Sequence, residues 1–239
     1  MKAGLAQARE WVGRARAVSV LTGAGISAES GIPTFRGAGG LWKQFRVEEL
    51  ASPQAFARDP RAVWEWYDSR RQQIAKAEPN PGHLALAELE RRTGSFTLIT
   101  QNVDGLHARA GSRSILEVHG NLWTLRCTTC GREWQDRTVP LVIPPKCECG
   151  GLARPGVVWF GEMLPEQVWS EATRSVEKCD VFLVAGTSAL VYPAAGLITL
   201  AKGAGARVIE VNSERTSFSD MVDCTLRGKS GEILPQLIA

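Results

Sequence analysis

Four short, continuously apolar segments constrain the fold of this chain more than any other feature. They are residues 17–22, 96–100, 181–185 and 207–211, and stretches with helical character separate them. A strand that is apolar on both faces must be covered on both faces, which is typical of parallel sheets in α/β proteins. The sequence therefore predicts a Rossmann-like, doubly wound parallel sheet.

Two helices of this fold have clear sequence signals. Residues 5–16 have amphipathic spacing, and Asn80 and Pro81 begin a second helix that runs to Arg92. The chain has 239 residues, of which 44% are hydrophobic and 22% charged. This composition is that of an ordinary globular protein with one or two domains.

Residues 123–155 interrupt the alternation of strands and helices. This segment is rich in Pro and Gly, carries four cysteines and has no strong apolar pattern. We expect it to be a small inserted module that something other than a core of its own holds together. Residues 1–122 and 156–239 would then form the Rossmann-like domain.

The four cysteines of this segment form two close pairs, Cys127-x2-Cys130 and Cys147-x-Cys149. Two thiolate pairs joined by a loop are typical of a tetrahedral, zinc-ribbon type of site, and four thiolates leave no open position for a water molecule. The sequence therefore predicts one structural Zn²⁺. Two disulfides are the alternative, which reducing intracellular conditions disfavour.

The charge of the chain argues against a nucleic-acid partner. The net charge is +3 and the pI is near 8.6, whereas phosphate binding requires concentrated Lys and Arg. In the zinc module, five basic residues are nearly balanced by three acidic residues and the negative charge of a four-thiolate zinc centre.

Residues 181–201 form the one uncharged stretch long enough to span a bilayer. Gly186 and Pro193 interrupt it, so we interpret it as a strand, a loop and a helix rather than a membrane helix. Charged residues among the first 16 positions exclude a secretory signal. We expect a cytoplasmic protein with no membrane partner.

Gly23 and Gly25 follow the first apolar segment and suggest a dinucleotide site. Glycine lets the backbone approach a pyrophosphate, and Ala28 stands where the usual fingerprint has its third glycine. A tight strand-to-helix turn without a ligand is the alternative interpretation.

One of the three histidines is a candidate general base. His119 lies in an apolar stretch that ends at a glycine, where its side chain can reach a cleft at a strand end, and its ordinary pKa suits proton abstraction near neutrality. A structural role for His119 is the alternative. His83 and His107 are interpreted as structural, and Cys179 and Cys224 as core residues.

Several motifs together resemble those of the sirtuins, the NAD-dependent protein deacylases. They are GAGISAESGIPTFRG at residues 23–37, QNVDGLH at 101–107, VHG at 118–120, the four cysteines, VWFGE at 158–162, GTS at 186–188 and VN at 211–212. The resemblance extends from about residue 10 to the C-terminus. Small departures are Val103, where isoleucine is common, and the tight second cysteine pair.

This resemblance implies an NAD site, a base and a peptide-binding segment. The residues that would contact NAD are Gly23, Ala24, Gly25, Ser27, Pro33, Thr34, Phe35, Arg36, Gln101, Asn102, Val103, Asp104, Gly186, Thr187, Ser188, Asn212, Ser213, Glu214 and Ser230. His119 would be the general base. The edge strand that pairs with the substrate peptide would consist of Val158, Trp159, Phe160, Gly161 and Glu162.

The resemblance also implies the reaction. The acyl-lysine amide oxygen attacks the ribose carbon that bears nicotinamide, and the base then draws a proton from the ribose hydroxyls so that a hydroxyl attacks the imidate carbon. Nicotinamide, free lysine and 2′-O-acyl-ADP-ribose are released, and NAD is consumed. A mono-ADP-ribosyltransferase and a non-catalytic NAD-sensing module are the alternatives, and His119 disfavours the second.

Tyr67 and Arg70 narrow the expected acyl group. They stand at i and i+3 of a predicted helix, hence on one face, where a phenol and a guanidinium can bind a carboxylate together. This pair, with the small Ala51 widening the acyl pocket, resembles the sirtuin branch that removes succinyl and malonyl groups. A surface Arg beside a packed Tyr is the alternative. The expected substrates are acyl-lysine proteins or peptides.

Overall fold

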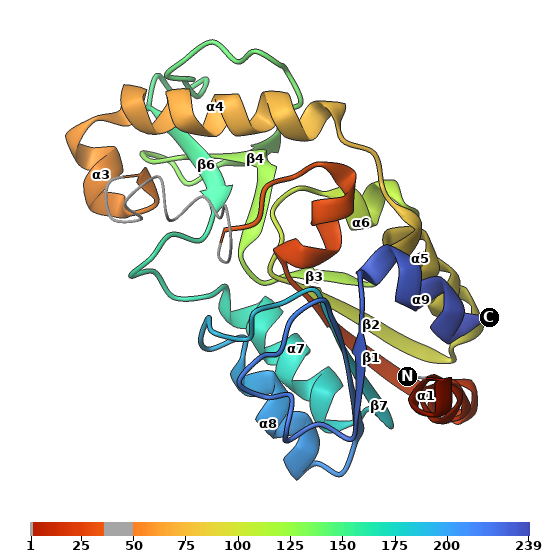
Figure 1. Cartoon of the computed structure of the whole chain (residues 1–239). Helices are drawn as coiled ribbons and strands as arrows, with labels where there is room; N and C mark the ends of the chain where they lie inside the picture. The colour runs from red at the N-terminus through yellow and green to blue at the C-terminus, as the bar shows by residue number, and fades with distance from the viewer. Residues whose placement is uncertain (1, 36–49) are drawn as a thin grey trace.

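The computed structural model describes residues 2–35 and 50–239, and its centre is a six-stranded parallel sheet with the order β3-β2-β1-β7-β8-β9 (Figure 1). The strands are β1 (Ala17–Thr22), β2 (Ser95–Thr100), β3 (Ile115–Glu117), β7 (Val181–Ala185), β8 (Arg207–Asn212) and β9 (Cys224–Arg227). The four predicted strands are β1, β2, β7 and β8, and they pair in parallel as predicted. The outer strands β3 and β9 have only three and four residues, too few for a recognisable sequence pattern.

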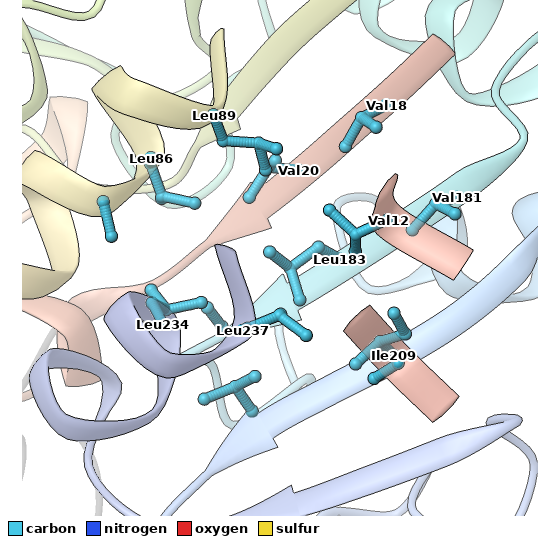
Figure 2. Close-up of a cluster of buried hydrophobic side chains, with 14 of the residues drawn as sticks. Val12, Val18, Val20, Leu86, Leu89, Val181, Leu183, Ile209, Leu234 and Leu237 are labelled. Carbon is cyan, nitrogen blue, oxygen red and sulfur yellow. The ribbon is translucent and has the colours of Figure 1, made fainter. Parts of the chain in front are cut away.

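Helices cover both faces of this sheet, which confirms the doubly wound architecture (Figure 1). The helices on one face are α1 (Lys2–Arg14), α5 (Pro81–Arg92) and α9 (Ser230–Ile238), and those on the other are α7 (Glu166–Glu177) and α8 (Gly196–Gly203). Of the two helices predicted with bounds, α5 ends at Arg92 as predicted, and α1 begins at Lys2 and ends at Arg14 rather than covering residues 5–16. Figure 2 shows how Val20, Leu183 and Ile209 of the sheet meet Leu86 of α5 and Leu234 of α9 in one buried cluster.

The order of the strands determines where a ligand can bind. The chain adds β2 and β3 on one side of β1 and β7, β8 and β9 on the other, so the strand order reverses at β1. In open α/β sheets, ligands bind beyond the carboxyl ends of the strands at such a reversal. The loops after β1, β2, β7 and β8 meet there.

A second, three-stranded antiparallel sheet has the order β5-β4-β6 and is formed by β4 (Gly120–Cys127), β5 (Glu133–Gln135) and β6 (Ala153–Val157). Two helices, α3 (Pro53–Arg58) and α4 (Pro60–Lys76), share a core with it. Trp64 of α4 is fully buried and donates its indole N–H to the Ala153 carbonyl at 2.8 Å. The inserted segment lacks an apolar pattern of its own because helices from a distant part of the chain complete its core.

The uncharged stretch of residues 181–201 forms β7, a loop and the start of α8, as the sequence predicts. Across residues 2–35 and 50–239, no helix combines the length and the apolar character needed to cross a bilayer. The described ranges also contain the 3₁₀ helix η1 (Ala24–Ser30) and the short helix α6 (Leu106–Arg109).

Candidate active site

The glycine turn after β1 packs directly on the loop after β7. The Gly25 N–H donates to the Gly186 carbonyl at 2.7 Å, and a Cβ at Gly25 would lie 2.6 Å from that oxygen. Gly186 has a φ of 62°, and a Cβ there would lie 2.3 Å from the Ile26 nitrogen. These two positions therefore require glycine because the two loops approach each other too closely for a side chain.

The loop after β2 inserts polar side chains between these two loops. Gln101 donates to the Thr187 hydroxyl at 2.9 Å, and Asn102 donates to the Gly23 carbonyl at 3.1 Å. Asn102 also lies 3.2 Å from the Ser27 hydroxyl. Residues that are far apart in the sequence and predicted to contact NAD thus meet at the carboxyl edge of the sheet.

Asp104 is the buried acid of this region, with only 4% of its surface exposed. It accepts hydrogen bonds from the Ser27 hydroxyl at 2.8 Å and from the Leu106 N–H at 2.9 Å. Burial raises the pKa of Asp104, and these two donors oppose that rise only in part. An Asp held in this way has acceptor capacity left for an amide donor.

Two buried histidines lie directly behind these residues. His83 Nε2 is 3.3 Å from the Ser27 hydroxyl, and His107 Nε2 is 2.9 Å from the Thr22 hydroxyl. Burial lowers the pKa of His83 to about 4 and that of His107 well below its ordinary value, so both rings are neutral. Both are buried beside residues expected to contact NAD, and no sequence signal predicts this placement.

A pocket at this point is lined by Ala24, Ser27, Ile32, Pro33, Phe35, Arg70, Asn102, Val103 and Asp104. Seven of these residues were predicted to contact NAD, and Arg70 was predicted for the acyl group. Ile32 was not among the predicted site residues, because an apolar residue inside a loop motif is not distinguishable by sequence from a packing residue. Arg36 lies outside the described residues.

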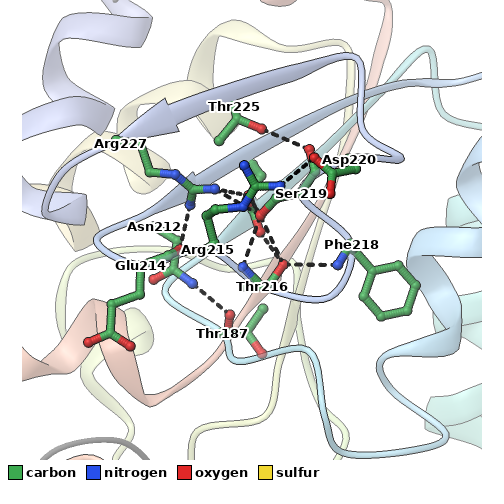
Figure 3. Close-up of polar contacts among 11 residues, drawn as sticks. Thr187, Asn212, Glu214, Arg215, Thr216, Phe218, Ser219, Asp220, Thr225 and Arg227 are labelled. Atoms are coloured by element: carbon green, nitrogen blue, oxygen red, sulfur yellow. Dashed lines mark hydrogen bonds and ion pairs between the residues drawn. The ribbon is translucent and has the colours of Figure 1, made fainter.

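Figure 3 shows the polar cluster at the end of β8. The Asn212 amide donates to the Thr187 carbonyl at 2.9 Å, which joins the loops after β7 and β8. Arg227 donates to the Glu214 carbonyl and forms an ion pair of 3.3 Å with the buried carboxylate of Glu210. The Glu214 carboxylate points away from the cluster. Glu210, which the sequence analysis missed, anchors this loop from inside a strand.

The other residues predicted at this end of the NAD site have varied environments. Ser188 and Ser213 are exposed on the loops after β7 and β8. Ser230 is buried as the first residue of α9, whose next residue, Gly231, donates its N–H to Glu29 of η1 at 2.7 Å. The end of α9 that carries Ser230 is thus joined to η1.

His119 lies between β3 and β4, at a strand end as predicted. Its Nδ1 is 3.2 Å from the Gln101 carbonyl oxygen. A carbonyl can only accept, so Nδ1 carries the proton and Nε2 is left as the acceptor. Burial lowers the pKa of His119, which the hydrogen bond to Gln101 opposes. The ring is therefore a neutral base at pH 7.

The expectation that residues 158–162 form an edge strand is wrong in this structure. Strand β6 ends at Val157, and the next five residues form a turn in which Gly161 has a φ of 87°. The Val158 N–H donates to the His119 carbonyl at 2.8 Å and the Phe160 N–H to the Ala51 carbonyl at 3.0 Å. These internal bonds occupy the backbone donors that a free edge would present.

The four cysteines of the inserted segment converge, with their Sγ atoms all within 4.8 Å of one another. The closest pairs, Cys127–Cys149 at 3.5 Å and Cys130–Cys147 at 3.8 Å, are too far apart for disulfides, and all four thiols are free. Four sulfur donors at this spacing fit a tetrahedral Zn²⁺. Cys179 and Cys224 are buried in the core as predicted.

Comparison with known proteins identifies the family. Residues 23–193 match the model of the Sir2 family. The chain belongs to the Sir2 family. A relative from Aquifex aeolicus, an NAD-dependent protein deacylase, is 58% identical over 215 residues, which are 89% of this chain and 90% of the relative.

Solved structures of Sir2 homologues agree with this assignment. The ADP-ribose complex of a mutant Sir2 homologue has a TM-score of 0.94 and 51% identity, and covers 97% of this chain and 94% of its own. An NAD complex of a Sir2 homologue has a TM-score of 0.92 and 51% identity, and covers 98% of this chain and 92% of its own. This sirtuin is an NAD-dependent protein deacylase that uses NAD as its co-substrate.

In this sirtuin, Tyr67 and Arg70 lie on α4 and are both buried, so the alternative of a surface Arg is wrong. The Arg70 guanidinium lies 4.7 Å from the centroid of the Phe35 ring and 5.2 Å from that of Trp66. The Tyr67 hydroxyl oxygen accepts a hydrogen bond from Trp159 Nε1 at 2.9 Å. Ala51 is buried as well, beside α3.

Proposed function

We propose that this deacylase removes succinyl and malonyl groups, in addition to acetyl groups, from protein lysines. The products would be nicotinamide, free lysine and 2′-O-acyl-ADP-ribose. The observation that carries this proposal is a buried guanidinium, that of Arg70, with a donor that lacks a partner among the described residues.

Arg70 is 6% exposed and lines the same pocket as Asp104 and Phe35. Within the described ranges, its Nη1 is buried and has no hydrogen-bond partner, and no ion pair involves its guanidinium. Burial lowers the pKa of Arg70, and the electrostatic effects of the nearby Tyr67 and Asp104 oppose this only in part. An unpaired buried cation is costly, and a carboxylate on the acyl group would supply the missing partner.

Tyr67 supplies a neutral donor on the same helix face. Burial raises the pKa of Tyr67 to about 12, despite the opposing effects of Trp159 and Arg70, so the hydroxyl stays protonated at physiological pH. Ala51, 5% exposed, keeps the side-chain volume small where its carbonyl meets Phe160. These features support a pocket that is wider and more polar than an acetyl group requires.

For the chemistry, we assign the general base to His119. Its neutral ring and its Nδ1 contact with Gln101 support abstraction of a ribose hydroxyl proton by Nε2. Asp104 is assigned to accept from the nicotinamide carboxamide, because it is buried and keeps acceptor capacity. The other described residues expected to contact NAD lie in η1, on the loops after β1, β2 and β7, at the end of β8 and on the loop after it, and at the first residue of α9, and their contacts with NAD are part of this proposal.

The substrate partners in this proposal are proteins or peptides that carry acyl-lysine, and the turn at residues 158–162 would contact their backbone. Free thiols at the proposed zinc site support a reducing, cytoplasmic location. We also propose that the small module comprises residues 123–155 together with α3 and α4, since these helices share its core.

The test is mass spectrometry of the products formed from NAD and one peptide that carries acetyl-, malonyl- or succinyl-lysine. We expect 2′-O-succinyl- and 2′-O-malonyl-ADP-ribose, with one nicotinamide released for each lysine freed. Turnover of the acetyl peptide alone would contradict the proposed acyl range. Transfer of ADP-ribose to the peptide would indicate a mono-ADP-ribosyltransferase, and NAD binding without turnover would indicate a sensor.

A further inference from the structure

A chain of four side chains connects the substrate-binding turn with the proposed acyl pocket. Its members are Glu162 and Trp159 of the turn, Arg154 of β6 and Tyr67 of α4. Trp159 is at its centre and is only 3% exposed. Trp159 and Tyr67 are 92 positions apart in the sequence, so the connection exists only in the folded protein.

The hydrogen bond between Trp159 and Tyr67 has only one possible donor–acceptor direction. An indole N–H can only donate, so in the 2.9 Å bond from Trp159 Nε1 the Tyr67 oxygen is the acceptor. The Tyr67 hydroxyl hydrogen is then free to bond elsewhere. Among the described residues, the hydrogen bond given for this hydroxyl is the one from Trp159. The bond from Trp159 therefore fixes the position of the Tyr67 oxygen and does not use its O–H donor.

Arg154 fixes the ring that makes this contact. Its guanidinium lies 3.5 Å from the centroid of the Trp159 ring and forms a two-pronged pair with Glu162, at 2.6 and 2.8 Å. Glu162 in turn accepts the Trp159 backbone N–H at 2.8 Å. The indole is therefore held at its face by the guanidinium and at its backbone by the carboxylate. A planar, forked cation is suited to both contacts at once.

We propose that Arg154 and Glu162 are positioning residues that, through Trp159, orient the Tyr67 hydroxyl toward the carboxylate of a succinyl or malonyl group. This inference rests on the proposed function, since it assumes that such a carboxylate enters the pocket. It assigns part of the acyl selectivity to residues that do not contact the acyl group themselves.

The test is a double-mutant cycle with Trp159→Phe and Tyr67→Phe, measured on succinyl and acetyl forms of one peptide. Trp159→Phe keeps an aromatic ring but removes the N–H. We expect it to raise KM for the succinyl peptide about 3- to 10-fold, the range for one hydrogen bond, with a smaller change in kcat. In the Tyr67→Phe background the same substitution should change the succinyl KM by less than about 1.5-fold.

Arg154→Lys extends the cycle, because lysine keeps the charge but loses the forked pair and the flat stacking surface. We expect it to lower the succinyl-to-acetyl ratio of kcat/KM in the wild-type background and not in the Tyr67→Phe background. Trp64→Phe is the matched control, since it also removes a buried indole N–H bond, but one to the Ala153 carbonyl. It should lower the melting temperature and leave the acyl selectivity unchanged.

The results that overturn the positioning role differ from the result that overturns the proposed function. Additive effects of Trp159→Phe and Tyr67→Phe, or equal losses on both peptides, would overturn the positioning role while leaving the acyl range intact. A wild-type enzyme without succinyl turnover would overturn the proposed function and this inference with it.

Discussion

The guanidinium of Arg70 lies over the ring of Phe35, with its central carbon 4.7 Å from the ring centroid. Phe35 belongs to the loop expected to contact NAD, and Arg70 to the helix expected to bind the acyl group. The proposed NAD site and the proposed acyl site therefore share these two side chains as part of one pocket lining. A cation on an aromatic face is only partly compensated, so Arg70 remains available to an acidic ligand.

The first prediction concerns this guanidinium. Arg70→Met keeps much of the length and removes the charge, so it should lower kcat/KM for a succinyl peptide by about 2–5 kcal/mol of transition-state binding. An acetyl peptide, which has no carboxylate, should lose far less. Steady-state kinetics on both forms of one peptide measure the difference, with Tyr67→Phe as the milder companion. Equal losses on both peptides would mean that Arg70 only supports the fold.

The second prediction concerns His119. Replacement by Ala should lower turnover by the roughly 10²–10⁴-fold that is typical of general base catalysis, whereas NAD should still bind. Because burial lowers the pKa of His119, the acid limb of the wild-type kcat profile should fall below the ordinary histidine pKa, and activity should be flat from neutral pH upward. Calorimetric NAD titration provides the binding control. Wild-type turnover by the variant would refute the assignment.

The third prediction concerns the four cysteines. Elemental analysis should find one zinc per chain, and Cys127→Ala should lose it and lower the melting temperature, since structural zinc contributes folding free energy. Cys224→Ala, outside the cluster, should keep the metal. Zinc-free protein with two intact disulfides would contradict the site.

Loss of zinc should also loosen α4. Arg71 donates to the Leu122 carbonyl at 3.0 Å and to the Asp136 carbonyl at 2.8 Å, and Asp68 accepts the Leu141 N–H at 2.9 Å. These bonds attach α4 to β4 and to the cysteine-bearing segment, so amide hydrogen exchange should rise in residues 60–76 on chelation. An increase in exchange that is confined to residues 123–155 would show that the stability of α4 does not depend on zinc.

The fourth prediction is a pH dependence of stability. The folded pKa of His83 is about 4, below the unfolded value of about 6.5, so the unfolded chain binds more protons between these values. Stability should therefore be complete above pH 6.5 and fall, by up to about 3 kcal/mol for this group, as the pH drops toward 4. His107 acts in the same direction.

Denaturant unfolding of wild type and His83→Gln at several pH values isolates this contribution. The variant should be less stable at neutral pH, because the ring fills a buried site, but should lose less stability on acidification. Parallel pH profiles of the two proteins would exclude His83 as the source. The carboxylates titrate in both proteins and cancel in the comparison.

Local sequence determined the framework of this protein. The apolar segments at residues 17–22 and 181–185 form β1 and β7. A strand that is buried on both faces can be recognised from its own continuous apolar sequence. The cysteine spacing likewise indicated a cluster, since two cysteines separated by one or two residues lie close together in space whatever the rest of the fold. The sequence motifs identified the family and included most of the residues that line the pocket, such as Ser27 and Asp104.

Tertiary structure determined the contacts between segments that are distant in the sequence, which local sequence patterns do not predict. The helices at residues 53–76 complete the core of the small sheet, although no sequence pattern within these helices indicates that they pack on that sheet. The segment at residues 158–162 is a turn because its backbone donors find His119 and Ala51, which are distant in sequence. The bond from Trp159 to Tyr67 and the unpaired Nη1 of Arg70, seen among the described residues, arise in the same way. Hydrogen-bond satisfaction and burial are properties of the assembled chain, so only the folded structure shows which donors remain free for a ligand.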